Sequence, residues 1–228
     1  MENVLTEQEA HAIESLEQCV RETFGHEMPF YEVRAFGEDT EQPTYGLYNV
    51  DGGNYCTFLN GLLQMYLPGV AATITHTIQT AYEELDWGGI LDLPSPDSLG
   101  LRTAEFLRYR TTGKLGLHED DGSVYSISIA LSDPSDYSGG YFQLQTQEAL
   151  FRVPKRSAIV FFSHSTHAIT DILDGERTVF VAELWEDDDT PVGIPRPDEE
   201  VFHDFKVDRL EALEGAKEHT DNGETTDA

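Results

Sequence analysis

Two stretches in the first hundred residues have the hydrophobic spacing of amphipathic helices. Thr6 and Glu9 form a capping-box pattern, in which a hydroxyl and a carboxylate satisfy free backbone N–H groups at the start of a helix. The apolar residues that follow share one helical face up to about residue 24: Ala10, Ile13, Leu16 and Val20. Pro68 suits the first turn of a second helix, which we expect to run through Leu85.

From about residue 102 the pattern changes to short strands. Residues 123–131 read SVYSISIAL, in which large apolar and small residues alternate with the period of two that a strand requires. Further strands are expected at Ala104–Arg110, 141–145, Phe151–Val153, Ala158–Phe162 and Thr178–Trp185. Many short strands with Gly- and Pro-bearing turns favour a mainly β fold with flanking helices (α+β). Its core would be a double-stranded β-helix, or jelly roll, with the helices outside one sheet.

The remaining segments predict loops and extensions of one domain. Residues 25–60 favour loops and short strands, and residues 87–100 favour a loop. We expect residues 1–100 to pack on the core, residues 101–186 to form the jelly roll with the candidate chemistry, and residues 187–228 to form an acidic extension. A short helix is expected near 205–216 and a disordered tail after about 215.

The formal charge of −29, from 43 acidic and 14 basic residues, narrows the possible partners. It argues against binding to nucleic acids and to anionic membranes, since both need clustered Lys and Arg. Residues 101–185 are nearly balanced, with 11 acidic and eight basic residues, so an anionic cosubstrate remains compatible with them. The polar N-terminus, the absence of an 18-residue apolar run and only two cysteines, Cys19 and Cys56, favour a reduced, cytoplasmic protein.

The candidate chemistry lies in two segments of the strand-rich half. His118 and Asp120 are two residues apart in LGLHEDDGS, and His167 follows 47 residues after Asp120 in FFSHSTHAIT. Residues two apart on a strand project to the same face. Two histidines and one carboxylate can hold one face of a divalent iron and leave the opposite positions open. A His-x-Asp pair alone also arises by chance on a solvated turn, so the residues around it must decide whether it is a metal site.

Those surroundings form a longer pattern. Tyr109 and Gly113 precede His118 in the spacing Y-x₃-G-x₄-H-x-D, and a Y-x-G-G segment ends in Gly139 and Gly140. His167 opens the spacing H-x-[VI]-x-x-[VI]-x-x-G-x-R, which ends at Arg177. Over residues 103–185 the chain resembles the prolyl 4-hydroxylase-like family of iron(II)- and 2-oxoglutarate-dependent dioxygenases.

The resemblance implies a role for each matched position. His118, Asp120 and His167 match the iron ligands, and Arg177 matches the residue that binds the far carboxylate of 2-oxoglutarate through its planar fork. Tyr109 matches a tyrosine that lines the cosubstrate pocket. Ascorbate is implied as a reductant. Thr170 and Thr178 are weaker candidates for the pocket. The rivals for metal binding are His164, which would break the spacing to Arg177, and Glu119 and Asp121, which would point to the other face of the strand.

Three hypotheses about function follow from these predictions. The first is hydroxylation of a protein or peptide side chain, with a prolyl residue as the first choice because of the family that the chain resembles. The resemblance also implies that the carboxylate Asp120 favours hydroxylation over halogenation. The second is the same chemistry on a small metabolite. The third is a metal-binding jelly-roll interaction protein without turnover, although such a protein would have no use for Arg177.

Overall fold

The computed structural model describes residues 1–24, 27–29, 47–50, 54–146 and 149–186. The helix expected near 205–216 and the acidic tail lie outside these residues. The α-helices are α1 (Glu7–Phe24), α3 (Leu62–Tyr66), α4 (Pro68–Glu84) and α5 (Trp87–Leu91). The strands are β1 (Glu27–Pro29), β2 (Leu47–Val50), β3 (Asn54–Phe58), β4 (Gly100–Arg110), β5 (Leu115–His118), β6 (Tyr125–Ala130), β7 (Tyr137–Gly139), β8 (Phe142–Leu144), β9 (Leu150–Phe151), β10 (Ala158–Phe162), β11 (His167–Ile169) and β12 (Ile172–Trp185).

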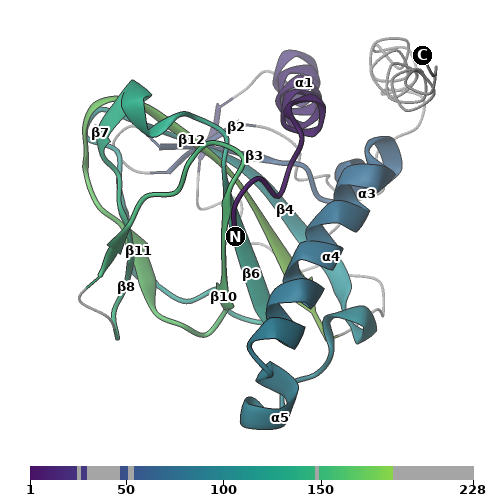
Figure 1. The fold of residues 1–228 in the computed structure, drawn as a ribbon. Coiled ribbons are helices and arrows are strands. Elements are labelled where there is room, and N and C mark those ends of the chain that lie inside the picture. Colours follow the sequence, from purple (N-terminus) through teal and green to yellow (C-terminus); the bar gives the residue numbers. More distant parts are fainter. Residues whose placement is uncertain (25–26, 30–46, 51–53, 147–148, 187–228) are drawn as a thin grey trace, which may run out of the picture.

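The strands form two sheets, which confirms the predicted mainly β jelly-roll fold with flanking helices. The larger sheet has the order β1-β2-β3-β4-β12-β6-β10, with β7 paired to β12, and the smaller has the order β5-β11-β8-β9. Only the β1–β2 pairing is parallel among the described strands. Figure 1 shows α1 and α4 on one face of the larger sheet, with β8 and β11 beyond its other face.

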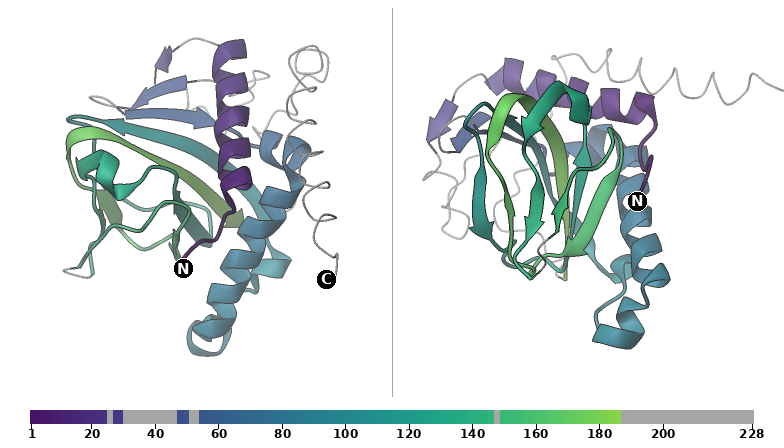
Figure 2. Two further views of the ribbon diagram at one scale, coloured as in Figure 1. Left: turned by 45° about the horizontal axis from the view of Figure 1, so that its top comes forward. Right: turned by 60° about the vertical axis from the view of Figure 1, so that its left-hand side comes forward.

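Two hydrophobic cores occupy the two spaces between these layers. The first joins the inner faces of α1 and α4 to the larger sheet, and it includes Ile13, Leu16, Ile74 and Phe180. The second lies between the two sheets and includes Phe142, Phe161 and Val179. Figure 2 shows the same layering from two other sides. Because burying one such side chain is worth about 1.5–3 kcal/mol, each core holds its layers firmly together.

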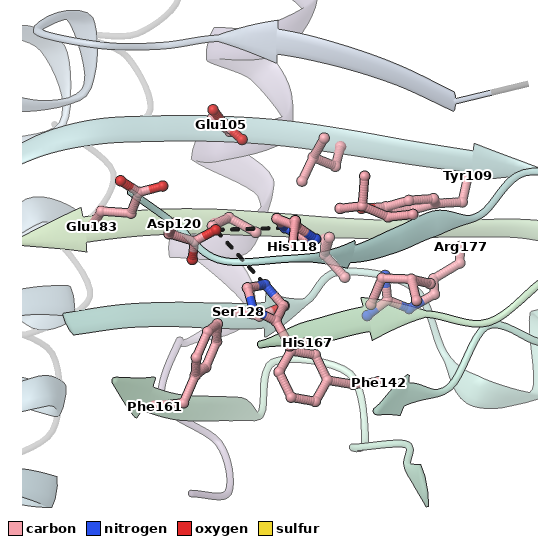
Figure 3. A pocket seen from close by; sticks show the side chains of 15 residues that line it. Glu105, Tyr109, His118, Asp120, Ser128, Phe142, Phe161, His167, Arg177 and Glu183 are labelled. Atoms are coloured by element: carbon pink, nitrogen blue, oxygen red, sulfur yellow. Dashed lines mark ion pairs between the residues drawn. The ribbon is translucent and has the colours of Figure 1, made fainter. Parts of the chain in front are cut away.

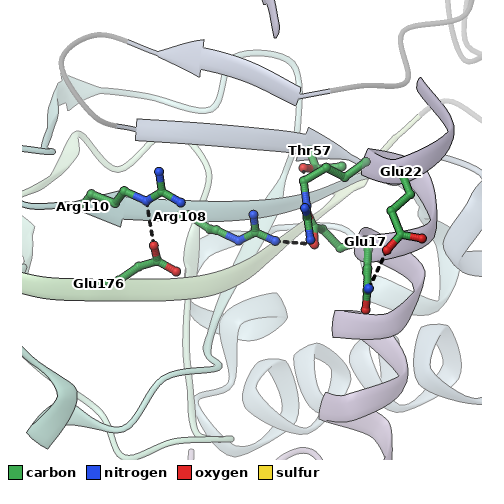
Figure 4. Close-up of polar contacts among 8 residues, drawn as sticks. Glu17, Glu22, Thr57, Arg108, Arg110 and Glu176 are labelled. Atoms are coloured by element: carbon green, nitrogen blue, oxygen red, sulfur yellow. Dashed lines mark hydrogen bonds and ion pairs between the residues drawn. The ribbon is translucent and has the colours of Figure 1, made fainter. Parts of the chain in front are cut away.

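The helix α1 begins and packs as its sequence predicts. The backbone N–H of Thr6 donates to Glu9 Oε2 at 2.8 Å, and the N–H of Glu9 donates to the Thr6 hydroxyl at 3.2 Å, so the capping box is confirmed. Glu17, on the buried side of this helix, accepts a 3.1 Å hydrogen bond from Thr57 and pairs with Arg108 of β4 (Figure 4). These contacts fix α1 against the sheet strand that carries part of the candidate site.

Several element boundaries differ from the prediction. Residues 87–91 form the helix α5 where a loop was expected, because the buried Trp87 stacks on Tyr125 with 5.6 Å between ring centroids. That packing overrides the low helix propensity of the two glycines in this turn. The strands β4 and β12 are longer than expected, and β11 was not predicted. Within the described ranges, every helix is too short or too polar to cross a lipid bilayer.

Candidate metal centre and cosubstrate pocket

A cavity that opens to solvent lies between the two sheets, with about 420 Å³ of empty space when the open solvent at its mouth is included. Its floor comes from β4 and β12 of the larger sheet, and its other walls include residues of β5, β8, β10 and β11. All five residues singled out by the sequence line it: Tyr109, His118, Asp120, His167 and Arg177. Figure 3 shows how these side chains, from elements far apart in the sequence, converge on one space.

His118 and His167 face each other across the pairing of β5 with β11. They occupy directly opposed positions in that pairing, and their ring centroids are 4.2 Å apart. The Nδ1 atom of His118 lies 2.8 Å from the carbonyl of Gly116, and that of His167 lies 2.9 Å from the carbonyl of Ser165. A carbonyl can only accept, so each Nδ1 must carry the proton and donate it. Each Nε2 atom is therefore left with a free lone pair, as a metal ligand requires.

Asp120 follows the end of β5 instead of lying on it, so the strand argument for its orientation is wrong. A loop positions it: its N–H donates to the Ser163 carbonyl at 2.9 Å, and its own carbonyl accepts from the Ser123 hydroxyl at 3.0 Å. Its side-chain Oδ2 accepts a 2.6 Å hydrogen bond from the hydroxyl of Ser126. The other oxygen, Oδ1, lies 3.5 Å from His118 Nε2 and 3.7 Å from His167 Nε2.

These three side chains fit one divalent ion. Their ligand atoms all lie within 4.8 Å of one another. Donors bound at about 2.1 Å to one ion lie roughly 3.0–3.4 Å apart, so the distances of 3.5 and 3.7 Å from Asp120 to the two imidazoles are within a few tenths of an ångström of that range. Burial lowers the pKa of His167, which keeps it neutral. Burial acts to raise the pKa of Asp120, but hydrogen bonds from His118 and Ser126 outweigh it and the pKa ends lowered. A neutral imidazole and an ionised carboxylate are the forms that bind metal.

The pKa of His118 also depends on Asp120. Burial alone would lower its pKa, but in the protonated ring the contacts of Nε2 with Asp120 and of Nδ1 with the carbonyl of Gly116 outweigh burial and raise it. A cation placed between His118 and Asp120 would take over the stabilisation of the carboxylate from this imidazole.

The rival ligands gather elsewhere on the surface. The ligand atoms of Glu119, Asp121 and His164 also lie within 4.8 Å of one another, but all three residues are exposed. The carboxylate of Glu119 accepts a 2.7 Å hydrogen bond from Thr166. None of these three lines the cavity that holds His118 and His167.

Arg177 is buried in the same cavity with part of its guanidinium unpaired. Its side chain packs over the ring of Tyr109, its direct partner in the pairing of β12 with β4, with Cζ 5.2 Å from the ring centroid. The residue is only 6% exposed, and its Nη1 has no hydrogen-bond partner among the described residues. A buried donor without a partner costs about 1–3 kcal/mol, so this position suits an anionic ligand. The burial of Tyr109 raises the pKa of its hydroxyl, which therefore remains a donor.

The two glycines of the Y-x-G-G segment allow the side chain of Arg177 to pack closely against the backbone. Gly139 and Gly140 adopt positive φ angles of 77° and 62°. A Cβ on Gly139 would lie 2.1 Å from the carbonyl oxygen of Asp171, and one on Gly140 would lie 3.0 Å from Cδ of Arg177. Glycine therefore permits both the turn and the close approach of the arginine stem.

The two threonines considered for the pocket point elsewhere. The Thr170 hydroxyl accepts a hydrogen bond from the N–H of Tyr141, and Thr178 does not line the cavity. Sequence reasoning missed Ser126, which orients Asp120, and the two cavity glutamates Glu105 and Glu183. The sequence signal that could have found these three residues is a polar residue at an inward-facing position of an otherwise apolar strand.

Comparison with known proteins gives the following relatives. No protein-family model matches the chain. A curated PKHD-type hydroxylase of Sphingopyxis alaskensis is 36% identical over 86 residues, which cover 32% of this chain and 39% of that protein. The match therefore spans less than half the length of that relative. This similarity to a hydroxylase agrees with the resemblance that the motifs indicate.

Two solved structures are similar in fold. A prolyl-4-hydroxylase of Pseudomonas putida has 16% identity and a TM-score of 0.49, covering 82% of this chain and 91% of that one. An oxidoreductase of the 2OG-Fe(II) oxygenase family from Burkholderia pseudomallei has 16% identity and a TM-score of 0.45, covering 73% of this chain and 80% of that one.

Proposed function

We propose that this chain is an iron(II)- and 2-oxoglutarate-dependent dioxygenase that hydroxylates a carbon atom of its substrate. The observation that supports this most directly is the cavity itself. Its lining combines a set of two histidines and one carboxylate with a buried guanidinium whose Nη1 lacks a partner among the described residues. A 2-His-1-carboxylate set with open positions is typical of non-haem iron(II) oxygenases.

Each side chain has a defined task in this proposal. His118 Nε2, His167 Nε2 and Asp120 Oδ1 would hold the iron, since their other polar atoms are already bound to Gly116, Ser165 and Ser126. When bound, iron and 2-oxoglutarate together reduce dioxygen, giving succinate and carbon dioxide as one oxygen atom enters a C–H bond of the substrate.

The far end of the cavity would orient the cosubstrate. The guanidinium of Arg177 would donate to the carboxylate of 2-oxoglutarate that is remote from the metal, and the Tyr109 hydroxyl would add a further hydrogen bond. Between these ends the cavity is lined by apolar side chains, including Leu107, Phe161 and Val179, which exclude water from the reacting atoms.

The family resemblance favours a prolyl residue of a protein or peptide as substrate, with a small metabolite as the alternative, and the name of the curated relative supports hydroxylation. Ascorbate as a reductant also rests on that resemblance. A non-catalytic jelly-roll scaffold is disfavoured, because burying an unpaired guanidinium is costly unless a ligand binds it.

The test is succinate formation from 2-oxoglutarate with iron(II) in air. Turnover of the cosubstrate without added substrate would already distinguish an enzyme from a scaffold. His167→Ala should abolish iron-dependent turnover and Mn(II) binding, while His164→Ala, at the exposed rival site, should change neither. Full activity of His167→Ala would refute the ligand assignment.

A further inference from the structure

The turn that follows β10 contacts two of the three proposed metal ligands. The N–H of Ser165 donates to the carbonyl of Phe162 at 2.8 Å and closes this turn. The carbonyl of Ser165 lies 2.9 Å from Nδ1 of His167, and the carbonyl of Ser163 accepts from the N–H of Asp120 at 2.9 Å. One short segment therefore sets the positions of a histidine ligand and of the carboxylate ligand.

Ser163 binds the loop after β5 and the start of β6 with all three of its polar groups. Its carbonyl holds the N–H of Asp120, and its own N–H donates to the carbonyl of Val124 at 3.1 Å. Its hydroxyl lies 2.8 Å from the hydroxyl of Ser126 on β6. Both serines are fully buried, so water does not compete for this contact.

The acceptor at the end of this network fixes the direction of both hydroxyl protons. An ionised carboxylate can only accept, so Ser126 gives its one hydroxyl proton to Asp120 Oδ2, at 2.6 Å. In the contact between the two serines, Ser126 is therefore the acceptor and Ser163 the donor. These two hydroxyls form a serine relay that runs from Ser163 through Ser126 to Asp120. A hydroxyl that accepts a hydrogen bond is polarised and donates more strongly, above all in a buried site.

The serine relay acts on the oxygen of Asp120 that faces away from the histidines. Oδ2 is held by Ser126, whereas Oδ1 lies 3.5 Å from His118 Nε2 and 3.7 Å from His167 Nε2. A carboxylate fixed in this orientation presents Oδ1 to a metal before the metal arrives. A carboxylate that turns freely must be ordered during binding, and this ordering costs affinity.

We propose that Ser163 is a positioning residue of the metal centre, and that its hydroxyl acts through Ser126 to hold Asp120 ready for the metal. This rests on the proposed dioxygenase function. The side-chain effect can be separated from the structural one, because the backbone groups of Ser163 hold the loop through Asp120 and Val124. Alanine at position 163 keeps these backbone bonds and removes the hydroxyl alone.

A double-mutant cycle on the full chain, with Mn(II) affinity measured by calorimetry, tests this proposal without turnover. Ser163→Ala should weaken Mn(II) binding about three- to tenfold, the cost of ordering one side chain on binding. In the Ser126→Ala background the relay is already broken, so the same substitution should change the affinity by less than about twofold. Ser163→Thr keeps a hydroxyl and should recover most of the affinity that Ser163→Ala loses.

A buried serine at the other end of β10 gives a matched control. Ser157 is 1% exposed, and its hydroxyl accepts a 3.2 Å hydrogen bond from the N–H of Asn3, away from the cavity. Ser157→Ala should leave Mn(II) affinity within about twofold. Urea denaturation checks that each variant folds, and Ser163→Gly, which also lacks the hydroxyl, replaces Ser163→Ala in the cycle if the latter does not.

The outcomes separate this proposal from the one on which it rests. Unchanged Mn(II) affinity in Ser163→Ala would overturn the role of Ser163. An equal loss of affinity in both backgrounds of the cycle would also overturn it, because the hydroxyl would then act independently of Ser126. Failure of the unmodified protein to bind Mn(II) would instead overturn the metal centre and the dioxygenase function.

Discussion

Replacing Arg177 by methionine should separate cosubstrate binding from folding. Methionine keeps much of the length and the apolar contacts of the side chain but removes the guanidinium. In the free protein the unpaired Nη1 costs about 1–3 kcal/mol, while stacking on Tyr109 returns about 0.5–2 kcal/mol. Because these contributions nearly cancel, the free energy of unfolding should change by less than about 1 kcal/mol.

Binding of 2-oxoglutarate should respond far more strongly. Removing one partner of a buried, hydrogen-bonded charge pair costs about 2–5 kcal/mol. The dissociation constant should therefore rise roughly 30- to 4,000-fold. Calorimetric titration of 2-oxoglutarate into the Mn(II)-loaded protein measures this change, and urea denaturation of the free protein measures stability.

Two further variants sharpen the test. Arg177→Lys keeps the charge but loses the planar fork, so its affinity should lie between those of the unmodified protein and Arg177→Met. Arg110→Met removes an exposed guanidinium that pairs with Glu176 at 2.8 Å outside the cavity, and it should leave binding within about twofold. An unchanged affinity in Arg177→Met would refute the role assigned to this guanidinium.

Three other predictions follow from contacts around the site. Ser126→Ala removes the hydroxyl that fixes Asp120, so Mn(II) affinity should fall about 10- to 100-fold by calorimetry; an unchanged affinity would show that the loop alone orients the carboxylate. Gly139→Ala should destabilise the fold by about 1–3 kcal/mol in urea denaturation, whereas Gly116→Ala, whose Cβ meets no atom within 4 Å, should have little effect. The pKa of Glu105 is raised from 4.5 to about 8, so the metal-free protein should lose stability as pH rises through about 8. Glu105→Gln should reduce that loss between pH 6 and 8, and the part that remains comes from Glu183, whose pKa is raised to about 7; identical pH profiles for both proteins would contradict this.

The sequence predicted the architecture well where a pattern is long. The apolar spacing of α1 and the alternation of β6 both correspond to elements of the structure, because burial on one face imposes a period on many residues at once. Short elements were missed or misread. The three-residue strand β11 is too short to show a period, and α5 depends on the tertiary packing of Trp87.

The candidate site was predicted as a set of residues but not as a geometry. The motif spacing together with the family resemblance named His118, Asp120 and His167, which the structure brings together. The strand argument, however, placed Asp120 on a strand that ends two residues earlier. The serine that holds this carboxylate looked like one of several small residues on the strand β6. In the structure this serine is buried, because its hydroxyl contacts Ser163 after β10 and Asp120 in the loop after β5.

The pairing of β12 with β4 limits which mutations such a protein can accept during evolution. Both the guanidinium and an acidic group sit on one uninterrupted strand, so removing a single residue between them would turn one of the two to the opposite side of the sheet. Point substitutions at positions 105 and 183 carry no such penalty. This end of the cavity floor therefore tolerates an exchange of side chains but not a deletion in β12, which would turn Arg177 or Glu183 out of the cavity.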